Sequence, residues 1–506
     1  MNFVNTSAGP PAAAGTEFDL LGALFSPAGR ADPHVILRSS PLPGCQYPFV
    51  RDVLRDPRFA APSIPPSADP AFQLLARWMI RLDGDRHRRV RDAFGGLFTA
   101  RRAGRYRAII AERAAALIDH AAPAGSMDLV VGFARPLPFS VINDVLGVPS
   151  GDRDWLDAAL AVLNRGFARQ RDSDRTAVQA ANDAAQQMLS YFAGLLDQRT
   201  AEPADDLMTA LAARHAEGED RQDLLANCIF FINAGHQTTT TLLTLGTHLL
   251  CTHPEALAAL QEDPGRWPGA VEEMLRLITP TTFTGATPRT DADIDGVACP
   301  AGQPRLLFLA AANRAPSTFP DPDRFDISRD PNPHLSFAAG AHFCLGAPLA
   351  RLHGEVALST LFTRLPGLAA RTPPDITASV PIRQIDHFAV TWQRNRQTRP
   401  QSLAARVVPG ARSQFRCRVR KLAGSRLRTA ERDVLPRPTH GRLADGRAAL
   451  RRGRPVARSS LLRTGPLIHL PWLIRAFQVA GSISPRVPAR SYLACNPCTA
   501  VRVSEP

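Results

Sequence analysis

The ten residues Phe337-Ala-Ala-Gly340-Ala-His342-Phe-Cys344-Leu-Gly346 decide the fold that we expect for this chain. A cysteine framed by glycines stands here directly before a helical pattern over 347–364. Because the start of a helix stabilises an anion through its dipole and its free amide groups, this loop could present a thiolate to a metal. A lone cysteine between glycines is, taken by itself, more often a small buried residue. Both interpretations stay open until the other motifs are considered.

A second motif lies upstream, in Glu273-Met-Leu-Arg276. Residues three apart share one face of a helix, so this glutamate and arginine can pair with two parallel hydrogen bonds. Most such pairs are solvated surface ion pairs. The irregular segment that runs from Asn313 to Asp326 offers Arg324 as a further partner. The sequence therefore predicts a buried network of Glu273, Arg276 and Arg324.

A third motif, Ala234-Gly235-His236-Gln237-Thr238-Thr239, interrupts the long apolar helix expected over 224–250. Glycine costs about 1 kcal/mol relative to alanine inside a helix. The motif is either an incidental polar patch or a local opening of the helix. In an opening, the Thr238 hydroxyl and freed carbonyls would hold water beside a metal-bound oxygen.

His87 and Arg91 form a fourth feature, four residues apart in a charge-rich stretch. One helix face would then present two donors to a single carboxylate. Taken alone, a stretch with so much charge is more often a solvated helix face.

The wider pattern predicts a mainly α-helical fold with a small β component. Helical periodicity begins near Phe49 and continues with breaks to about 278. Short β-like runs at 297–299 and 306–309 follow, and the alternation over 385–392 predicts a closing strand.

Composition limits the class of protein. The chain has 506 residues, of which 44% are hydrophobic and 21% are charged, which indicates a globular protein. The chain has 60 Lys and Arg and 46 Asp and Glu. Residues 396–506 contain 23 of the basic and 4 of the acidic residues, so this tail has a net charge of +19 and the remainder of the chain one of −5. The basic net charge therefore does not identify the body as a nucleic-acid-binding protein. Eight scattered cysteines and the lack of a long apolar run near Met1 favour a soluble cytoplasmic protein without signal peptide or membrane anchor.

In this order, the four motifs resemble the cytochrome P450 family, in its soluble bacterial branch, over about residues 15–395. The resemblance implies a fold with a long central helix over a haem and the cysteine loop beneath it. It implies haem b, with Cys344 as the axial ligand of the iron. The remaining site residues that it implies are partners of the haem in the cysteine loop and on the propionates (Gly346, His342, His87, Arg91), an oxygen-activating segment (Ala234, Gly235, Gln237, Thr238) and a structural triad (Glu273, Arg276, Arg324).

Three positions depart from the family pattern. Gln237 stands where the family usually has an acid, and an amide cannot ionise to relay a proton. Ala338 replaces a glycine of the cysteine loop, at a cost of about 1 kcal/mol if the position needs a positive φ. Ala286 aligns with an arginine that usually grips a haem propionate, and Arg289 follows three residues later as a candidate substitute.

The resemblance implies a monooxygenase that uses O2 and inserts one oxygen into a small hydrophobic molecule by hydroxylation or epoxidation, in secondary metabolism. Two electrons would come from a separate ferredoxin and ferredoxin reductase, with NAD(P)H as their source. The enzyme would be a monomer without nucleic-acid or membrane partners. One alternative keeps the haem but uses peroxide-driven or rearrangement chemistry, which Gln237 favours. The other is a non-catalytic module that binds haem or nucleic acid.

The expected organisation is a lead-in over 1–14, the family domain over 15–395 and an arginine-rich extension over 396–506. The extension has no Gly-rich dinucleotide fingerprint, and Cys495-Asn-Pro-Cys498 is a single pair without partners for a metal site. Its composition favours out-of-frame or read-through translation. The alternative is a basic disordered arm for nucleic acid, a membrane surface or an acidic partner.

Overall fold

The computed structural model describes residues 42–62, 64, 66–96, 100–169, 175–378 and 381–393. All of them belong to one of the two units into which the chain divides, and the other unit, Asn395–Leu467, lies outside the described residues. The lead-in expected over 1–14 and the extension expected over 396–506 also lie outside them.

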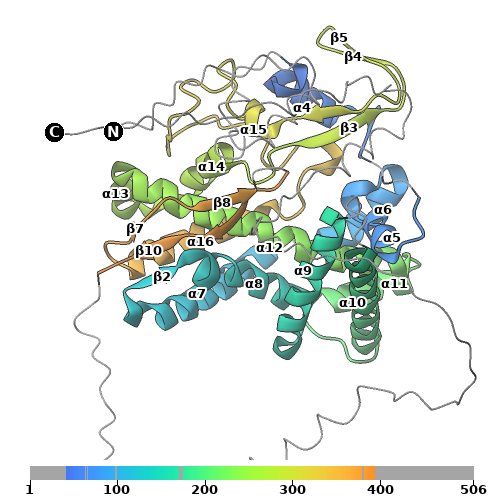
Figure 1. The fold of residues 1–506 in the computed structure, drawn as a ribbon, viewed down its shortest axis with the longest axis horizontal. Coiled ribbons are helices and arrows are strands. Elements are labelled where there is room, and N and C mark those ends of the chain that lie inside the picture. Colours follow the sequence, from blue (N-terminus) through green and yellow to red (C-terminus); the bar gives the residue numbers. More distant parts are fainter. Residues whose placement is uncertain are drawn as a thin grey trace, which may run out of the picture. The chain divides into compact units, whose positions relative to one another are not determined.

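Helices make up most of the described chain, as the sequence predicts (Figure 1). They are α4 (Tyr47–Arg55), α5 (Pro70–Ala76), α6 (Gly84–Gly95), α7 (Ala100–Ala121), α8 (Pro136–Leu146), α9 (Arg153–Arg169), α10 (Arg175–Ala201), α11 (Leu207–Ala216), α12 (Arg221–Thr252), α13 (Pro254–Glu262), α14 (Trp267–Ile278), α15 (Leu309–Ala312) and α16 (Ala347–Arg364). Over the described ranges, none of these helices combines the length and the apolar character needed to span a bilayer.

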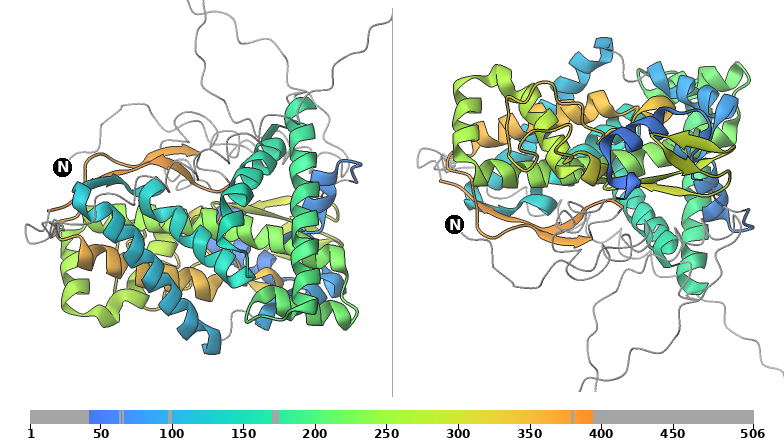
Figure 2. Two further views of the ribbon diagram at one scale, coloured as in Figure 1. Left: turned by 90° about the horizontal axis from the view of Figure 1, so that it is seen from below. Right: turned by 90° about the horizontal axis from the view of Figure 1, so that it is seen from above.

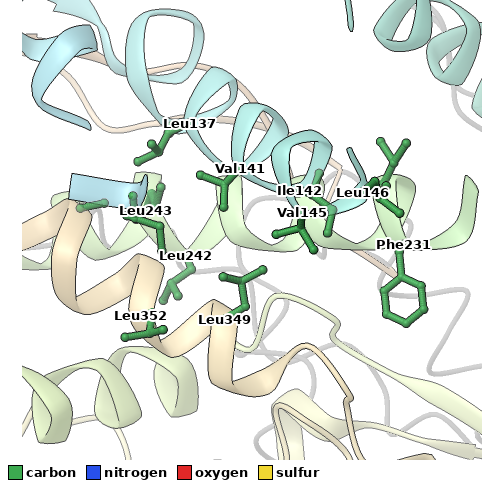
Figure 3. Close-up of a cluster of buried hydrophobic side chains, with 14 of the residues drawn as sticks. Leu137, Val141, Ile142, Val145, Leu146, Phe231, Leu242, Leu243, Leu349 and Leu352 are labelled. Carbon is green, nitrogen blue, oxygen red and sulfur yellow. The ribbon is translucent and has the colours of Figure 1, made fainter. Parts of the chain in front are cut away.

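The central helix is α12, which lies between α8 and α16 (Figure 3). Leu242 of α12 packs in the same buried cluster as Val141 of α8 and Leu349 of α16. Full burial of such a side chain is worth about 1.5–3 kcal/mol, so this layered core holds α12 firmly in place. Figure 2 shows α9 and α10 lying side by side, and they too pack against each other.

Helix α12 extends the predicted range of 224–250 to Arg221–Thr252 and runs without the expected interruption at Gly235. Its first turn is capped by Asp220, whose carboxylate accepts a hydrogen bond from the Asp223 amide at 2.9 Å. Of the two interpretations of this motif, the local opening is therefore not the one that the structure shows. The free-energy cost of a glycine in a helix is small compared with the stabilisation that α12 gains from packing against α8 and α16.

The strands are short and form separate small sheets. They are β1 (Phe59–Ala60), β2 (Ser126–Asp128), β3 (Thr284–Pro288), β4 (Ala292–Ile294), β5 (Val297–Cys299), β6 (Arg305–Leu307), β7 (Ala369–Ala370), β8 (Asp375–Ala378), β9 (Gln384–His387) and β10 (Ala389–Thr391). The sheet orders are β1-β3-β6, β2-β10-β7, β4-β5 and β8-β9, and all pairs are antiparallel.

The predicted strands are confirmed in part. The strand at 297–299 is β5, whereas the run at 306–309 ends its strand at Leu307 and begins α15 at Leu309. The single closing strand predicted over 385–392 is two strands in two different sheets. The chain changes sheet at Phe388, which is fully buried and whose amide donates to the Asp128 carboxylate at 3.1 Å.

Candidate functional site

The cysteine loop forms a tight turn directly before α16, as the sequence predicts. The Cys344 amide donates to the Phe337 carbonyl oxygen at 2.9 Å, which closes the loop. Gly340 has φ +69°, and a Cβ there would stand 2.3 Å from the carbonyl oxygen of Leu54 in α4. Only glycine fits at this position, so the glycine framing fixes how the loop docks on α4.

The Cys344 side chain lies where backbone amides and positive charges converge. Burial is the largest influence and raises the pKa of the Cys344 thiol. The amides of Gly346 and Ala347 and the charges of Arg91 and Arg351 act in the opposite direction and lower that pKa. These are the groups that stabilise a thiolate at the start of a helix.

Two segments far apart in sequence each bring a basic side chain to the Asp83 carboxylate, just before α6. The His342 Nε2 lies 3.3 Å from the Asp83 Oδ1, and the Arg289 Nη2 lies 3.0 Å from the Asp83 Oδ2. The His342 ring lies against the His87 ring, with centroids 4.2 Å apart and ring planes tilted by 36°. Burial, followed by the charges of His342 and Arg91, lowers the pKa of His87 to about 4. The structure therefore gathers His87, His342 and Arg289 into one cluster beside Arg91.

The donors of this cluster fit the carboxylates of a haem. The His87 Nε2 is buried and has no hydrogen-bond partner among the described residues. Leaving a buried polar group unpaired costs about 1–3 kcal/mol, so a hydrogen-bond acceptor placed beside this nitrogen would stabilise the protein. The neighbouring donors, Arg289 and His342, already bind one carboxylate, that of Asp83. An external carboxylate beside His87 would satisfy the unpaired nitrogen and add to the same charge pattern.

Arg289, directly after β3, reaches the basic cluster, whereas Ala286 does not. Ala286 is a buried residue of β3, and its methyl group cannot reach an anion. The Arg289 backbone amide donates to the Arg58 carbonyl at 2.8 Å, which holds the end of β3 beside α4 and lets the guanidinium reach Asp83. The candidate substitute is thus part of the basic cluster.

The threonine segment of α12 keeps regular helical hydrogen bonding. The Thr238 hydroxyl donates to the Ala234 carbonyl at 2.9 Å, and the Thr239 hydroxyl donates to the Gly235 carbonyl at 2.9 Å. In each case the hydroxyl donates to the carbonyl four residues earlier in an intact helix, so the two threonines find hydrogen-bond partners without any opening of α12. Thr238 and Gln237 are partly exposed, whereas Thr239 is buried.

His236 faces away from this segment, toward α8. Its Nδ1 lies 3.0 Å from the Ile232 carbonyl, and its ring meets the Phe139 ring edge-on with centroids 5.6 Å apart. Burial lowers the pKa of His236, so its imidazole is neutral at neutral pH.

Glu273 and Arg276 form the buried pair that the sequence predicts, but Arg324 is not its third member. Both side chains are fully buried, and two hydrogen bonds of 2.7 Å join them. The third side chain is that of Arg329, whose Nε lies 3.2 Å from each Glu273 oxygen. Arg324 contributes only its backbone carbonyl, which accepts from the Arg276 Nη2 at 3.2 Å.

The physical reason for this correction is the turn that follows Arg324. Because its carbonyl points inward to Arg276, its side chain is exposed. The Arg329 amide then bonds to the Asp326 carbonyl at 3.1 Å, and this turn directs the second arginine to Glu273. Neither Arg329 nor Asp83 was predicted from the sequence, although each lies beside a motif quoted above. The signal that was available is the second arginine, five residues after the first.

Ala338 has φ +57°, the left-handed conformation that favours glycine. Replacing Ala338 with glycine should therefore stabilise the protein by about 1 kcal/mol, because alanine is strained there. Thermal unfolding of the two proteins measures the difference. Ala339→Gly is the matched control, since Ala339 has an extended backbone with φ −151° and should lose stability on the same change. Equal losses in both variants would contradict the strain at Ala338.

Comparisons with known proteins agree on one family. Residues 45–266 and 268–377 match the family model described as cytochrome P450. The chain is 38% identical over 363 residues to the cytochrome P450 monooxygenase PikC of Streptomyces venezuelae, which covers 69% of this chain and 85% of PikC. It is 37% identical over 317 residues to 6-deoxyerythronolide B hydroxylase of Saccharopolyspora erythraea, covering 61% of this chain and 76% of that protein.

Solved structures agree as well. The structure of P450BioI in complex with acyl carrier protein ligated to hexadec-9Z-enoic acid has a TM-score of 0.65 at 34% identity, covering 69% of this chain and 91% of that chain. A myxobacterial cytochrome P450 in complex with myristic acid has a TM-score of 0.65 at 33% identity, covering 73% of this chain and 99% of that chain.

Proposed function

The chain belongs to the cytochrome P450 family and is a haem-dependent monooxygenase, and on that premise we propose that its substrate is a small hydrophobic molecule of secondary metabolism. A separate ferredoxin and ferredoxin reductase deliver two electrons from NAD(P)H. The reaction is hydroxylation or epoxidation. The cysteine loop carries the proposal, because it aims amide donors and positive charge at a single thiol before α16.

We assign to Cys344 the thiolate that would hold the iron of a bound haem. The bound haem supplies the iron chemistry that activates O2, and a thiolate ligand favours cleavage of the O–O bond. The amides of Gly346 and Ala347 and the charges of Arg91 and Arg351 are the groups of this chain that would stabilise the sulfur as an anion once the iron binds it, against the opposing effect of burial. The loop bond from the Cys344 amide to Phe337 and the docking of Gly340 on α4 fix where that sulfur points.

We assign the haem carboxylates to His87, Arg91, Arg289 and His342. His87 contributes the buried Nε2 that lacks a partner in the described part of the chain. Arg289 and His342 share Asp83 at present, and a haem carboxylate would compete with it for both donors. Charge-assisted hydrogen bonds of this kind are stronger than neutral ones, so the cluster is suited to bind the negatively charged carboxylates of a haem.

We assign proton delivery to Thr238 with Gln237, on α12 next to Ala234 and Gly235. The Thr238 hydroxyl donates to Ala234, which leaves its oxygen lone pairs to accept a hydrogen bond from water. Gln237 can orient that water but cannot ionise. His236 is turned toward Phe139 and gives no replacement acid in this segment.

The names of similar enzymes and the molecules bound in similar solved structures support a hydrophobic substrate. One is a hydroxylase of 6-deoxyerythronolide B, and two structures hold fatty acyl groups. The test is a titration of the haem-loaded full chain with 6-deoxyerythronolide B, hexadec-9Z-enoic acid and myristic acid. We expect at least one hydrophobic probe to shift the haem absorbance band and to yield an oxygenated product with NAD(P)H, ferredoxin and reductase. Product formation without any need for these electron donors would contradict the proposal.

Replacing Gln237 with glutamate should increase the product formed per NAD(P)H consumed. A positioned acid is typically worth about 10²–10⁴-fold in a proton-transfer step, so its return should be visible in a reconstituted reaction. Gln187→Glu is the matched control, because Gln187 is exposed on α10 and the same change there should leave coupling unchanged. If Gln237→Glu lowers coupling at unchanged haem content, Gln237 suits a different reaction. Peroxide-driven or rearrangement chemistry would then be the better assignment.

A further inference from the structure

A second acidic residue of α14 forms a network of its own beside the buried pair. Glu272 directly precedes Glu273, and neighbouring residues of a helix point about 100° apart. The Arg351 Nε and Nη2 of α16 donate to the two Glu272 oxygens at 2.7 and 2.9 Å. This planar, two-bonded geometry fixes both side chains and joins α14 to the helix that the cysteine loop precedes.

His334 completes the hold on Glu272. The Ser336 amide donates to the His334 Nδ1 at 3.3 Å, so the proton of the neutral ring is on Nε2, which lies 3.2 Å from a Glu272 oxygen. Burial acts to raise the pKa of Glu272, but hydrogen bonds from Arg351 and His334 outweigh it and lower this pKa to about 2. Glu272 is therefore an anion at any pH at which the protein works.

The guanidinium of Arg351 reaches the cysteine loop through Phe337. It lies over the Phe337 ring, 4.7 Å from the centroid, at a distance typical of a cation–π contact. Phe337 is the residue whose carbonyl accepts the Cys344 amide at 2.9 Å. Arg351 thus packs on the residue that closes the loop, and this contact brings its positive charge close to the Cys344 side chain.

We propose that Arg351 is a positioning residue that stabilises negative charge on the Cys344 sulfur, and that Glu272 limits this effect by holding and partly neutralising the guanidinium. The consequence is a control over the reduction potential of the haem iron from the Glu272–Arg351 pair. A thiolate whose negative charge is stabilised by Arg351 donates less electron density to the iron. The positive charge of Arg351 therefore raises the reduction potential of the iron, and its loss lowers that potential. The inference rests on the assignment of Cys344 as the axial ligand.

The two members of the pair should act in opposite directions, which no purely structural role requires. The reduction potential of the haem-loaded full chain is measured by spectroelectrochemical titration in the parent and three variants. Arg351→Gln should lower the potential, and Glu272→Gln should raise it. Because Arg351 is 35% exposed and solvent screens its charge, we expect a change of at most about tenfold in the equilibrium constant, or 59 mV. Arg351→Lys keeps the charge and should restore most of the parent potential.

Arg107→Gln is the matched control. Arg107 also pairs with a carboxylate of α16, with its Nη2 2.5 Å from the Glu355 Oε2, but its side chain is half exposed and its ion pair is with Glu355 alone among the described residues. Its loss should leave the potential unchanged. Equal potentials in Arg351→Gln and Arg107→Gln overturn the inference, as do shifts of the same sign in Arg351→Gln and Glu272→Gln. If Arg351→Gln does not fold, the sign of the shift in Glu272→Gln decides.

The carbonyl complex of the reduced parent separates this inference from the function on which it rests. A parent without the absorbance typical of thiolate-ligated haem contradicts the assignment of Cys344, and the inference fails with it. A parent that has this absorbance, but whose potential does not respond to either member of the pair, overturns the inference alone.

Discussion

Replacing Glu273 with alanine should give protein that is mostly haem-free or aggregated. Arg276 is fully buried and would lose its two bonds of 2.7 Å to the carboxylate. Arg329 and Asn332 would lose the same acceptor, to which they donate at 3.2 and 3.0 Å. Stranding a buried charge costs about 3–5 kcal/mol, a large part of the stability of a typical domain. Haem content and soluble yield measure the loss.

Two further variants test the arrangement of this network. Arg324→Ala should behave like the parent, because its side chain is exposed and the contact to Arg276 is made by its backbone carbonyl. Arg329→Ala should lose stability, because its side chain reaches Glu273. If Arg324→Ala is the damaging change of the two, the third member of the network is the one that the sequence predicted. Full haem content in Glu273→Ala would contradict the network as a whole.

The difference between Arg324 and Arg329 shows where sequence reasoning stops. Both arginines lie in one irregular segment with no periodicity to say which side chain turns inward. The choice depends on the backbone path, which includes a positive φ of +48° at Asp321 and the turn from Asp326 to Arg329. The presence of an aspartate does not by itself predict a positive φ, because few aspartates adopt one.

The helix that begins at Ala347 was predictable to the residue, because its start has local causes. Gly346 caps the helix and Pro348 occupies its first turn, where a missing amide proton costs nothing. The docking of the loop itself was not predictable. It depends on the approach of Gly340 to the carbonyl of Leu54, a contact across 286 residues of sequence.

The interruption of α12 that Gly235 suggested is absent for a related reason. Glycine costs about 1 kcal/mol within a helix, which a short isolated peptide would show. In this protein the flanking leucines pack against α8 and α16, and each buried leucine contributes more than that cost. The Thr238 and Thr239 hydroxyls donate to the Ala234 and Gly235 carbonyls within this intact helix. Local preference was therefore outweighed by tertiary packing that no single motif displays.

Replacing Cys344 with serine should remove the thiolate from the iron and abolish oxygenation. Serine has almost the same shape, so the Cys344 amide can still bond to Phe337 and the loop can still close. Its hydroxyl, however, stays protonated where a cysteine becomes a thiolate, and it cannot supply the same electron donation. The expected change is complete loss of the ligand signature. Cys251→Ser is the matched control, because it removes another partly buried thiol at the end of α12.

The absorbance spectrum of the reduced carbonyl complex tests this central assignment most directly. The parent and Cys251→Ser should both show the band typical of thiolate-ligated haem. Cys344→Ser should bind less haem, and the haem that remains should lack this band. Retention of the band in Cys344→Ser would show that another residue holds the iron and would contradict the account.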